Sequence, residues 1–238
     1  MKHFFIDLDQ TLTSSRSVML RGHRDVFKAL CQERDVIVVS GATVRQIRRQ
    51  VACGDGFAIL AQAGNDAYDK LGTPLWTERL TNMQVKEALR LIHRLKAHFD
   101  YPVLDHNDLT EFRGAQVAYS VVGFNANKKE KYAFDPGGSK RVNALEVLSK
   151  DVKRLIGCGG EVTSAGTTSF NFNSIGKNKG SNISRFIERL KWDPNECVYF
   201  GDALYKGGND ESVIGVIKTI QVYSPEDTFR HLQDWETL

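Results

Sequence analysis

Short apolar runs alternate with amphipathic segments at both ends of the chain. The apolar runs are rich in β-branched and aromatic residues and are apolar on both faces, as buried parallel strands are. They predict strands at residues 3–6, 35–39, 57–60, 197–200 and 216–222. Apolar residues at helical spacing predict helices at 22–33, 43–51, 181–190 and 225–232. A strand–helix alternation of this kind predicts an α/β fold with a parallel sheet.

The middle of the chain has a different pattern. Residues 82–99 carry one apolar stripe and predict a long amphipathic helix, and a second helix is predicted at 139–156. Each is followed by a predicted hairpin, of strands 109–112 and 116–122 and then of strands 161–164 and 168–173. This order predicts an antiparallel sheet with helices on one face. We therefore expect a core domain of residues 1–80 and 176–238, interrupted by an α+β cap domain of residues 81–175.

Charge argues against two classes of partner. The net charge of +3, from 32 Lys and Arg against 29 Asp and Glu, is too balanced to indicate nucleic acid or a membrane surface. The basic runs at 45–49 and 128–131 are interpreted as solvated faces. Hydrophobic residues make up 41% of the chain, which is enough for a substantial core.

The cysteines and the N-terminus bear on location. The four cysteines are widely scattered and form no C-x-x-C pair, so we expect free thiols rather than zinc or a redox motif. The first predicted strand begins almost at once, which leaves no room for a signal peptide. These features predict a cytoplasmic protein.

Carboxylates follow two of the predicted strands. Asp7 and Asp9 come at the end of the first strand, Asp202 follows the strand at 197–200, and Asp210 lies in the same loop. Open α/β sheets bind ligands at the carboxyl ends of their strands, so we expect these side chains to converge. Hard oxygen ligands suit Mg²⁺, and a carboxylate can also attack phosphorus to form an aspartyl-phosphate. Taken alone, the first motif could equally be a strand that ends in a polar turn.

A hydroxyl and a lysine complete the predicted constellation. Ser40 and Gly41 end the second strand, where they could hold a phosphate oxygen, although a helix N-cap is an equal alternative for this motif alone. Lys179 lies just before the helix at 181–190, and by itself a surface lysine would be the usual interpretation. Phosphoryl transfer needs a nucleophile, a metal and fixed positive charge. The joint presence of these groups in this order therefore predicts a phosphoryl-transfer site.

Together these motifs resemble the haloacid dehalogenase (HAD) superfamily with a type IIB cap. The chain is similar to bacterial hydrolases of that subgroup, which are related to eukaryotic phosphomannomutase. The matching segments are residues 7–11, 38–41, 178–180 and 201–210, with the cap segments 111–120 and 131–136. The resemblance implies a HAD-like Rossmannoid sheet with an inserted cap.

The resemblance also implies roles for the residues of the motifs. Asp7 is the nucleophile and Asp9 the general acid/base. Ser40 and Lys179 bind the phosphoryl group, beside the amide of Gly41.

The same resemblance implies a Mg²⁺ site. The ion is held by Asp7, by the backbone carbonyl of Asp9 and by Asp202. Asn209 and Asp210 support this metal site.

The chain departs from the phosphomannomutase pattern at several positions. Gln10 stands where the superfamily usually has glycine. Gly123 and Phe124 occupy the place of a cap arginine, and Asn171 replaces an aspartate. Arg113 is the remaining candidate for substrate binding in the cap, with a surface salt bridge as its alternative.

These departures favour a Mg²⁺-dependent phosphatase that acts on a sugar phosphate or a similar small phosphometabolite. A hexose-phosphate mutase of the phosphomannomutase type is the alternative. A non-catalytic phospho-receiver or ligand-binding protein is a third interpretation, which the complete set of site residues argues against. No nucleic acid or membrane partner is expected.

Overall fold

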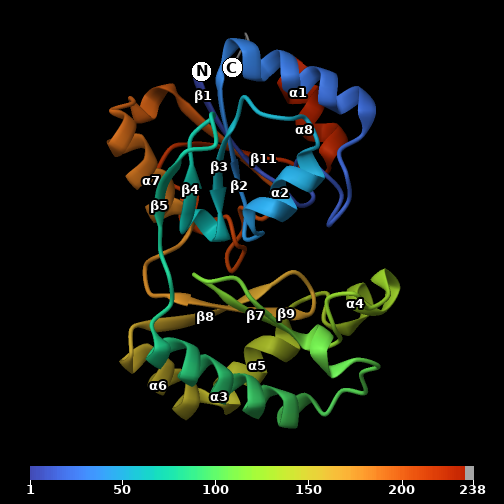
Figure 1. Cartoon of the computed structure of the whole chain (residues 1–238). Helices are drawn as coiled ribbons and strands as arrows, with labels where there is room; N and C mark the ends of the chain where they lie inside the picture. Colours follow the sequence, from blue (N-terminus) through green and yellow to red (C-terminus); the bar gives the residue numbers. More distant parts are fainter. Residues whose placement is uncertain (234–238) are drawn as a thin grey trace. The chain divides into compact units, whose positions relative to one another are not determined.

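The structure of residues 1–233, a computed structural model, divides into two compact units (Figure 1). The first unit joins Met1–Thr77 to the chain from Lys177 onward. The second unit, Glu78–Gly176, is inserted between these two segments. Within residues 1–233, no helix has both the length and the apolar character needed to cross a membrane.

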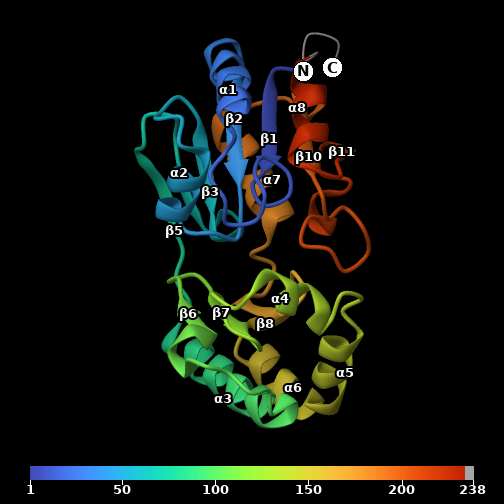
Figure 2. The ribbon, with the colours of Figure 1, turned by 90° about the vertical axis from the view of Figure 1, so that its right-hand side faces the viewer.

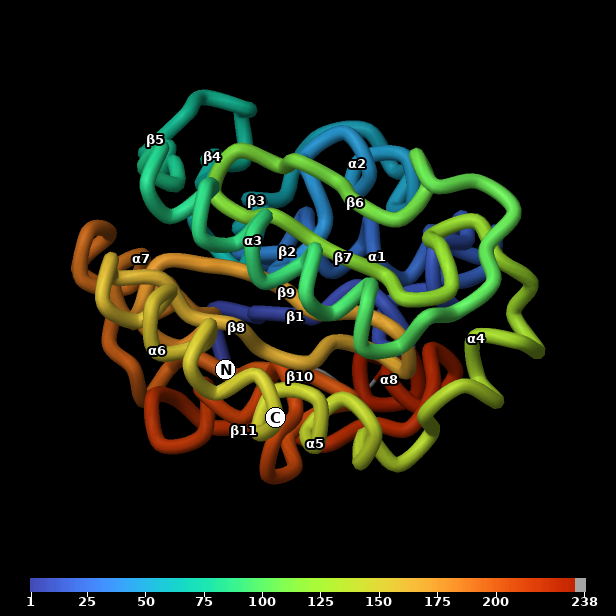
Figure 3. The backbone as a smooth tube through the Cα atoms, turned by 90° about the horizontal axis from the view of Figure 1, so that it is seen from below, coloured from blue at the N-terminus to red at the C-terminus, as the bar shows by residue number. Residues whose placement is uncertain are grey.

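A seven-stranded sheet forms the centre of the first unit. Its strand order is β11-β10-β1-β2-β3-β4-β5, which can be followed in Figure 3. The strands are β1 (His3–Asp7), β2 (Asp35–Val39), β3 (Ala58–Ala61), β4 (Asp66–Tyr68), β5 (Pro74–Thr77), β10 (Cys197–Gly201) and β11 (Lys218–Gln221). The neighbours from β11 to β3 pair in parallel, and β4 and β5 continue the sheet as antiparallel strands. The predicted α/β fold with a mostly parallel sheet is confirmed.

Helices cover both faces of this sheet because alternate strand residues point to opposite sides. The helices are α1 (Arg21–Glu33), α2 (Val44–Val51), α7 (Lys179–Leu190) and α8 (Pro225–Gln233). Phe4 of β1 lies in an apolar cluster with residues of α1, α2 and α8. Phe5, the next residue, lies in a second cluster with Ile183 and Phe186 of α7. The central strands are therefore buried on both faces, as their unbroken apolar runs predict.

The second unit is an antiparallel sheet covered by helices on one face (Figure 2). Its strand order is β6-β7-β9-β8. The strands are β6 (Thr110–Phe112), β7 (Val117–Ser120), β8 (Gly160–Ala165) and β9 (Ser169–Ser174). The helices are α3 (Asn82–Phe99), α4 (Lys128–Phe134), α5 (Ser139–Val147) and α6 (Ser149–Gly157).

The two faces of this second sheet differ in character. Val117, Tyr119, Phe170 and Phe172 point into the apolar core of the unit. The alternate positions of β7 and β9 therefore point to the opposite face, which is polar and carries Asn171. We call it the polar sheet face; its polar members include Glu111, Gln116, Ser120, Asn171 and Asn173.

One expectation about helices is corrected by the structure. The single helix predicted at 139–156 is two helices, α5 and α6, because the backbone at Leu148 leaves the helical region (φ −92°, ψ 22°). Leu148 is itself buried in the core of the second unit, so the break places an apolar residue inside. The basic run at 128–131 lies in a short helix, α4, which Asn127 caps through the amide of Lys129, and residues 128–130 are exposed, in agreement with a solvated face.

Two glycines, each the second residue of a helix, give opposite predictions for stability. Gly180→Ala in α7 should lower the free energy of unfolding by about 1–3 kcal/mol, because packing leaves no room for a methyl group there. The added Cβ would lie 1.8 Å from the backbone oxygen of Ser212. Gly22→Ala in α1, with no atom within 4 Å of the added Cβ, should raise the free energy of unfolding by about 0.5–1 kcal/mol. Urea unfolding of both variants measures the difference, and changes of the same sign would contradict it.

Candidate active site

The C-terminal ends of β10, β1 and β2 bring the predicted groups to one edge of the sheet (Figure 2). Asp7 is the last residue of β1 and pairs with Val39 of β2 in parallel register. Ser40 directly follows β2, and Asp202 directly follows β10. Since β1 lies between β10 and β2, Asp7 is flanked on both sides by these residues.

A buried ammonium group connects this edge to α7. Lys179 Nζ lies 2.5 Å from Asp7 Oδ1 and 2.6 Å from Asp210 Oδ1. It also donates a hydrogen bond to the Tyr199 hydroxyl oxygen at 3.2 Å. Lys179 is the first residue of α7 rather than a residue before the helix, and its side chain is only 2% exposed. The interpretation of Lys179 as a surface lysine is therefore wrong.

Asp210 is fully buried, and its carboxylate is held on both oxygens. Oδ1 accepts hydrogen bonds from Lys179 Nζ and from the Tyr199 hydroxyl, each at 2.6 Å. Oδ2 accepts the amide of Ala203 at 3.1 Å. The loop that carries Asp210 passes tightly through Gly208, where a Cβ would lie 2.0 Å from the Ala203 carbonyl oxygen. The 201–210 motif therefore turns back on itself and returns a carboxylate to the sheet edge.

Gln221 of β11 also forms hydrogen bonds with the loop that follows β10. Gln221 donates to the carbonyl oxygens of Asp202 and Val222, at 2.7 and 2.8 Å. Its own side-chain oxygen accepts the amide of Leu204 at 3.3 Å. These bonds fix the backbone at Asp202, whose side chain is half-buried, whereas Asn209 is exposed.

The cluster contains three carboxyl groups, those of Asp7, Asp202 and Asp210, and one ammonium group, that of Lys179. Burial raises the pKa of Asp7; Lys179 opposes the rise, and Asp210 and Asp202 add to it. Burial, followed by repulsion from Asp210, raises the pKa of Asp202 to about 6. Burial alone would lower the pKa of Lys179, but the carboxylates of Asp210 and Asp7 raise it, so this lysine is charged. The charge of one ammonium group therefore interacts with three neighbouring carboxyl groups.

The cluster fits a divalent cation. Asp7, Asp202 and Asp210 each offer a carboxylate oxygen, and these oxygens lie within 4.8 Å of one another. Carboxylate oxygens are ligands that Mg²⁺ prefers, and a dication would balance the excess negative charge. Both oxygens of Asp210 already accept hydrogen bonds. Asp7 and Asp202 are therefore the side chains best able to hold the ion, with Asp210 beside them.

Asp9 stands on a tight turn that follows β1. Its Oδ1 accepts the backbone amide of Arg16 at 2.9 Å, which fixes the carboxylate within the loop. Gln10 has φ 64° and Arg16 has φ 54°, both in the left-handed region. A side chain in that region costs about 1 kcal/mol relative to glycine. This backbone conformation explains why glycine is the usual residue where this chain has Gln10.

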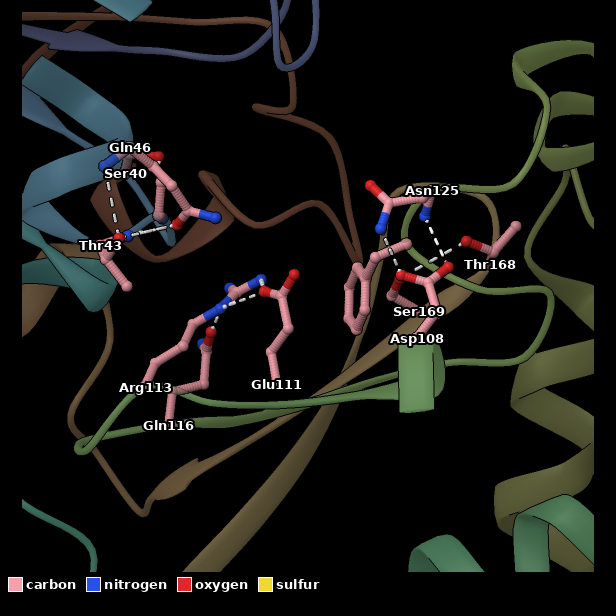
Figure 4. A network of polar contacts seen from close by, with 12 residues as sticks. Ser40, Thr43, Gln46, Asp108, Glu111, Arg113, Gln116, Asn125, Thr168 and Ser169 are labelled. Carbon is pink, nitrogen blue, oxygen red and sulfur yellow. Dashed lines mark hydrogen bonds and ion pairs between the residues drawn. The ribbon is translucent and has the colours of Figure 1, made fainter. Parts of the chain in front are cut away.

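Ser40 is buried and does not cap α2. Its Oγ accepts the amide of Ala42 at 3.1 Å. The N-cap of α2 is Thr43, which forms a capping box with Gln46 (Figure 4). The N-cap alternative for Ser40 is therefore wrong, and its hydroxyl is available to a phosphate oxygen. No atom lies within 4 Å of the Cβ that a side chain at Gly41 would add.

Arg113 belongs to the second unit, where it lies between β6 and β7. Its guanidinium donates to Glu111 Oε2 at 3.0 and 2.5 Å and to Gln116 Oε1 at 2.8 Å (Figure 4). Gln116 donates in turn to Asn173 on β9 at 2.9 Å. Arg113 thus forms an ion pair on the polar sheet face, but its side chain is only 10% exposed, so this is not the surface salt bridge of the alternative.

Three contributors to the site were not predicted from the sequence. Tyr199 gives a hydroxyl to the buried cluster, Gln221 holds the backbone at Asp202, and the amide of Arg16 holds Asp9. A tyrosine in an otherwise apolar parallel strand was a usable signal, because a buried hydroxyl needs a partner. The Gln221 side chain bonds to a backbone carbonyl, and Arg16 contributes only its backbone amide. The residue type does not reveal contacts of either kind.

Comparison with known families identifies related sequences. A family model described as eukaryotic phosphomannomutase matches residues 24–237. The match contains Ser40, Lys179, Asp202 and Asp210 but begins after Asp7. Phosphomannomutase 1 from Dictyostelium discoideum is 25% identical over 241 residues, which cover 96% of this chain and 94% of the relative.

Solved structures share the fold across the whole chain. An IMP-nucleotidase from Plasmodium falciparum has a TM-score of 0.72 at 14% identity and covers 100% of this chain and 68% of its own. A phosphatase of the haloalkanoate (HAD) enzyme superfamily from Bacteroides thetaiotaomicron has a TM-score of 0.63 at 13% identity, with 100% and 96% covered. At these identities the likeness concerns the fold alone.

The raised pKa of Asp202 predicts how metal and pH act on stability. Without metal, the native state holds this proton up to about pH 6, whereas the unfolded chain releases it at the ordinary carboxyl pKa of 3.8. The free energy of unfolding should therefore fall as pH rises through that window, and Asp202→Asn should remove this part of the fall. Mg²⁺ needs the ionised carboxylate, so it should raise the melting temperature at pH 7 and lose that effect below about pH 6.

Asp25→Asn on the exposed face of α1 is the matched control and should behave as wild type. Thermal unfolding with EDTA or with millimolar Mg²⁺ makes both comparisons. Equal Mg²⁺ stabilisation of wild type and Asp202→Asn would show that Asp202 is not a ligand.

Proposed function

Because the chain belongs to the eukaryotic phosphomannomutase family, we propose that it is a hexose-phosphate mutase that transfers a phosphoryl group through Asp7. The observation that carries the proposal is the buried Lys179 ammonium, which lies 2.5 Å from Asp7 at the end of β1. A nucleophilic carboxylate beside fixed positive charge is what phosphoryl transfer requires. The family match supports the mutase over the phosphatase that the departures at 123–124 and 171 favour.

The proposed transfer can be followed atom by atom. A carboxylate oxygen of Asp7 forms a bond to phosphorus while the bond from phosphorus to the sugar oxygen breaks. Asp9 gives its proton to that sugar oxygen. In the second half, a hydroxyl of a hexose monophosphate gives its proton to Asp9 and takes the phosphoryl group from Asp7, which forms the sugar bisphosphate without loss of phosphate.

Positive charge and hydrogen-bond donors stabilise this transfer. The Lys179 ammonium faces the phosphoryl group, and Ser40 with the amide of Gly41 would bind its oxygens. Asp7 and Asp202 would hold Mg²⁺, which supplies further positive charge to the phosphoryl oxygens when bound. Asp9 is kept in place by the amide of Arg16.

A mutase also needs a place for the second phosphate of a sugar bisphosphate. Arg113 of the second unit is the candidate that we propose for this role. Its planar guanidinium suits phosphate oxygens, and its bond to Gln116 fixes its orientation on the polar sheet face. A phosphate bound there would compete with Glu111, which forms an ion pair with Arg113.

A phosphatase is the second candidate, and specific observations favour it. Gly123 has φ 100°, and an added Cβ would lie 2.6 Å from Asp108 Oδ2, so this position excludes a side chain. Phe124 is buried, with its ring centre 5.8 Å from the Arg113 guanidinium, and it offers no charge to a phosphate. With fewer fixed cations to retain a bisphosphate, water would take the phosphoryl group from Asp7.

One assay separates the two candidates. Mannose 1-phosphate or glucose 1-phosphate is incubated with Mg²⁺ and a catalytic amount of the 1,6-bisphosphate, and both 6-phosphate and inorganic phosphate are measured. We expect the 6-phosphate to form faster than inorganic phosphate. Asp7→Asn should reduce transfer by about a thousandfold or more, because the nearly isosteric amide is not nucleophilic.

Asp25→Asn again serves as the matched control and should keep full activity. Faster release of inorganic phosphate would establish the phosphatase instead. Transfer at the wild-type rate by Asp7→Asn would remove Asp7 from the role of nucleophile.

A further inference from the structure

We infer that the Tyr199 hydroxyl is a positioning group for phosphoryl transfer, which keeps the Lys179 ammonium directed at Asp7. The inference rests on the proposed function, because it concerns the same buried site. It adds a residue from the middle of a core strand to a site otherwise built from strand ends, helix α7 and the 201–210 loop.

The Tyr199 hydroxyl forms hydrogen bonds with both Asp210 and Lys179, as a donor to the first and an acceptor from the second. It donates its hydrogen to Asp210 Oδ1 at 2.6 Å and accepts one from Lys179 Nζ at 3.2 Å. Tyr199 is fully buried, so water does not supply these bonds in its place. The hydroxyl thus both donates and accepts a hydrogen bond within the cluster that contains Asp7.

Packing alone does not require a tyrosine at this position. The ring lies in an apolar cluster with Phe5, Ile37 and Phe186, where phenylalanine would serve equally well. Burying a hydroxyl is unfavourable unless it is hydrogen-bonded, so its presence needs a reason beyond packing. The reason available here is its pair of bonds to Asp210 and Lys179.

Gly201 shows that the ring and the Asp210 carboxylate are packed closely together. A Cβ at residue 201 would lie 2.3 Å from Asp210 Oδ2 and 2.7 Å from Cε1 of Tyr199. The backbone of β10 therefore makes room for both groups at once. The Tyr199 ring is thus packed beside the Asp210 carboxylate, whose Oδ1 its hydroxyl reaches at 2.6 Å.

The hydroxyl changes the balance of attraction on Lys179. The ammonium has three hydrogens and three acceptors, namely Asp7, Asp210 and Tyr199. By donating to Asp210 Oδ1, the hydroxyl satisfies part of that oxygen's charge and weakens its pull on the ammonium. Without the hydroxyl, Lys179 would shift its bonding toward Asp210 and away from Asp7, where the phosphoryl group reacts.

This role predicts a loss of transition-state stabilisation at nearly constant substrate binding. An ammonium group held in a fixed orientation stabilises the negative charge on the phosphoryl oxygens in the transition state. Tyr199→Phe should therefore lower kcat about tenfold and leave KM within about twofold, as expected for one hydrogen bond to charged groups. Vanadate mimics the five-coordinate phosphorus of the transfer, so its inhibition constant should rise by the same factor as kcat falls.

Tyr119→Phe in the second unit is the matched control, because Tyr119 is also buried but lies in an apolar core. It should leave kcat and vanadate inhibition unchanged. The transfer assay with hexose 1-phosphate and vanadate titration are run on wild type and both variants, with circular dichroism to verify folding. A double variant with Asp210→Asn gives a second test, in which the tenfold effect of Tyr199→Phe should shrink because its acceptor charge is gone.

Unchanged kcat and vanadate inhibition in Tyr199→Phe, with an active wild type, would overturn the inference and leave the proposed function standing. A rise in KM with constant kcat, or full additivity with Asp210→Asn, would also overturn it. If Tyr199→Phe does not fold, the hydroxyl is needed for folding rather than positioning, and the inference fails. Wild type without any phosphoryl transfer would overturn the proposed function and the inference together.

Discussion

The Lys179 ammonium is the group on which the arrangement of the site depends. It is buried among the carboxylates of Asp7 and Asp210, with Asp202 close by. Carboxylates removed from water repel one another, and loss of one partner of a buried ion pair costs about 3–5 kcal/mol. The ammonium offsets this repulsion and leaves an excess negative charge that suits a divalent cation. The same contact that permits the carboxylates to be buried therefore prepares the site for phosphate and metal.

Close backbone approaches hold this group of charges together. Gly180, directly after Lys179, brings α7 against the backbone of Ser212, and Gly201 makes room for Asp210 beside Tyr199. Gly208 lets the loop after β10 fold back on Ala203. These contacts join α7, β10 and the following loop at the end of β1. The position of Lys179 is thus set by the packing of α7 against the chain that follows β10.

Strand ends were predictable from the sequence, and contacts between them were not. Unbroken β-branched runs predict parallel strands, and this pattern alone assigns Asp7, Ser40 and Asp202 to one sheet edge. The burial of Lys179 and its bond to Tyr199 depend on how α7 packs, which local pattern does not encode. The break at Leu148 was missed because residues 139–156 keep a helical spacing on both sides of it. The preference for a phosphatase rested on Phe124 and Asn171, and the family match supports a mutase better.

The most direct test of the role of Lys179 is the pH dependence of stability in Lys179→Met without metal. Urea unfolding is measured between pH 4 and 8 for this variant, for wild type and for Lys28→Met, a surface control on α1. Burial raises the pKa values of Asp7 and Asp202, so at pH 4 these two groups are protonated and the variant should lie closer to wild type than at pH 8. Toward pH 8 their ionisation has no buried cation to offset it, and the variant should lose about 3–5 kcal/mol more than wild type. A difference from wild type that is the same at every pH would contradict the account.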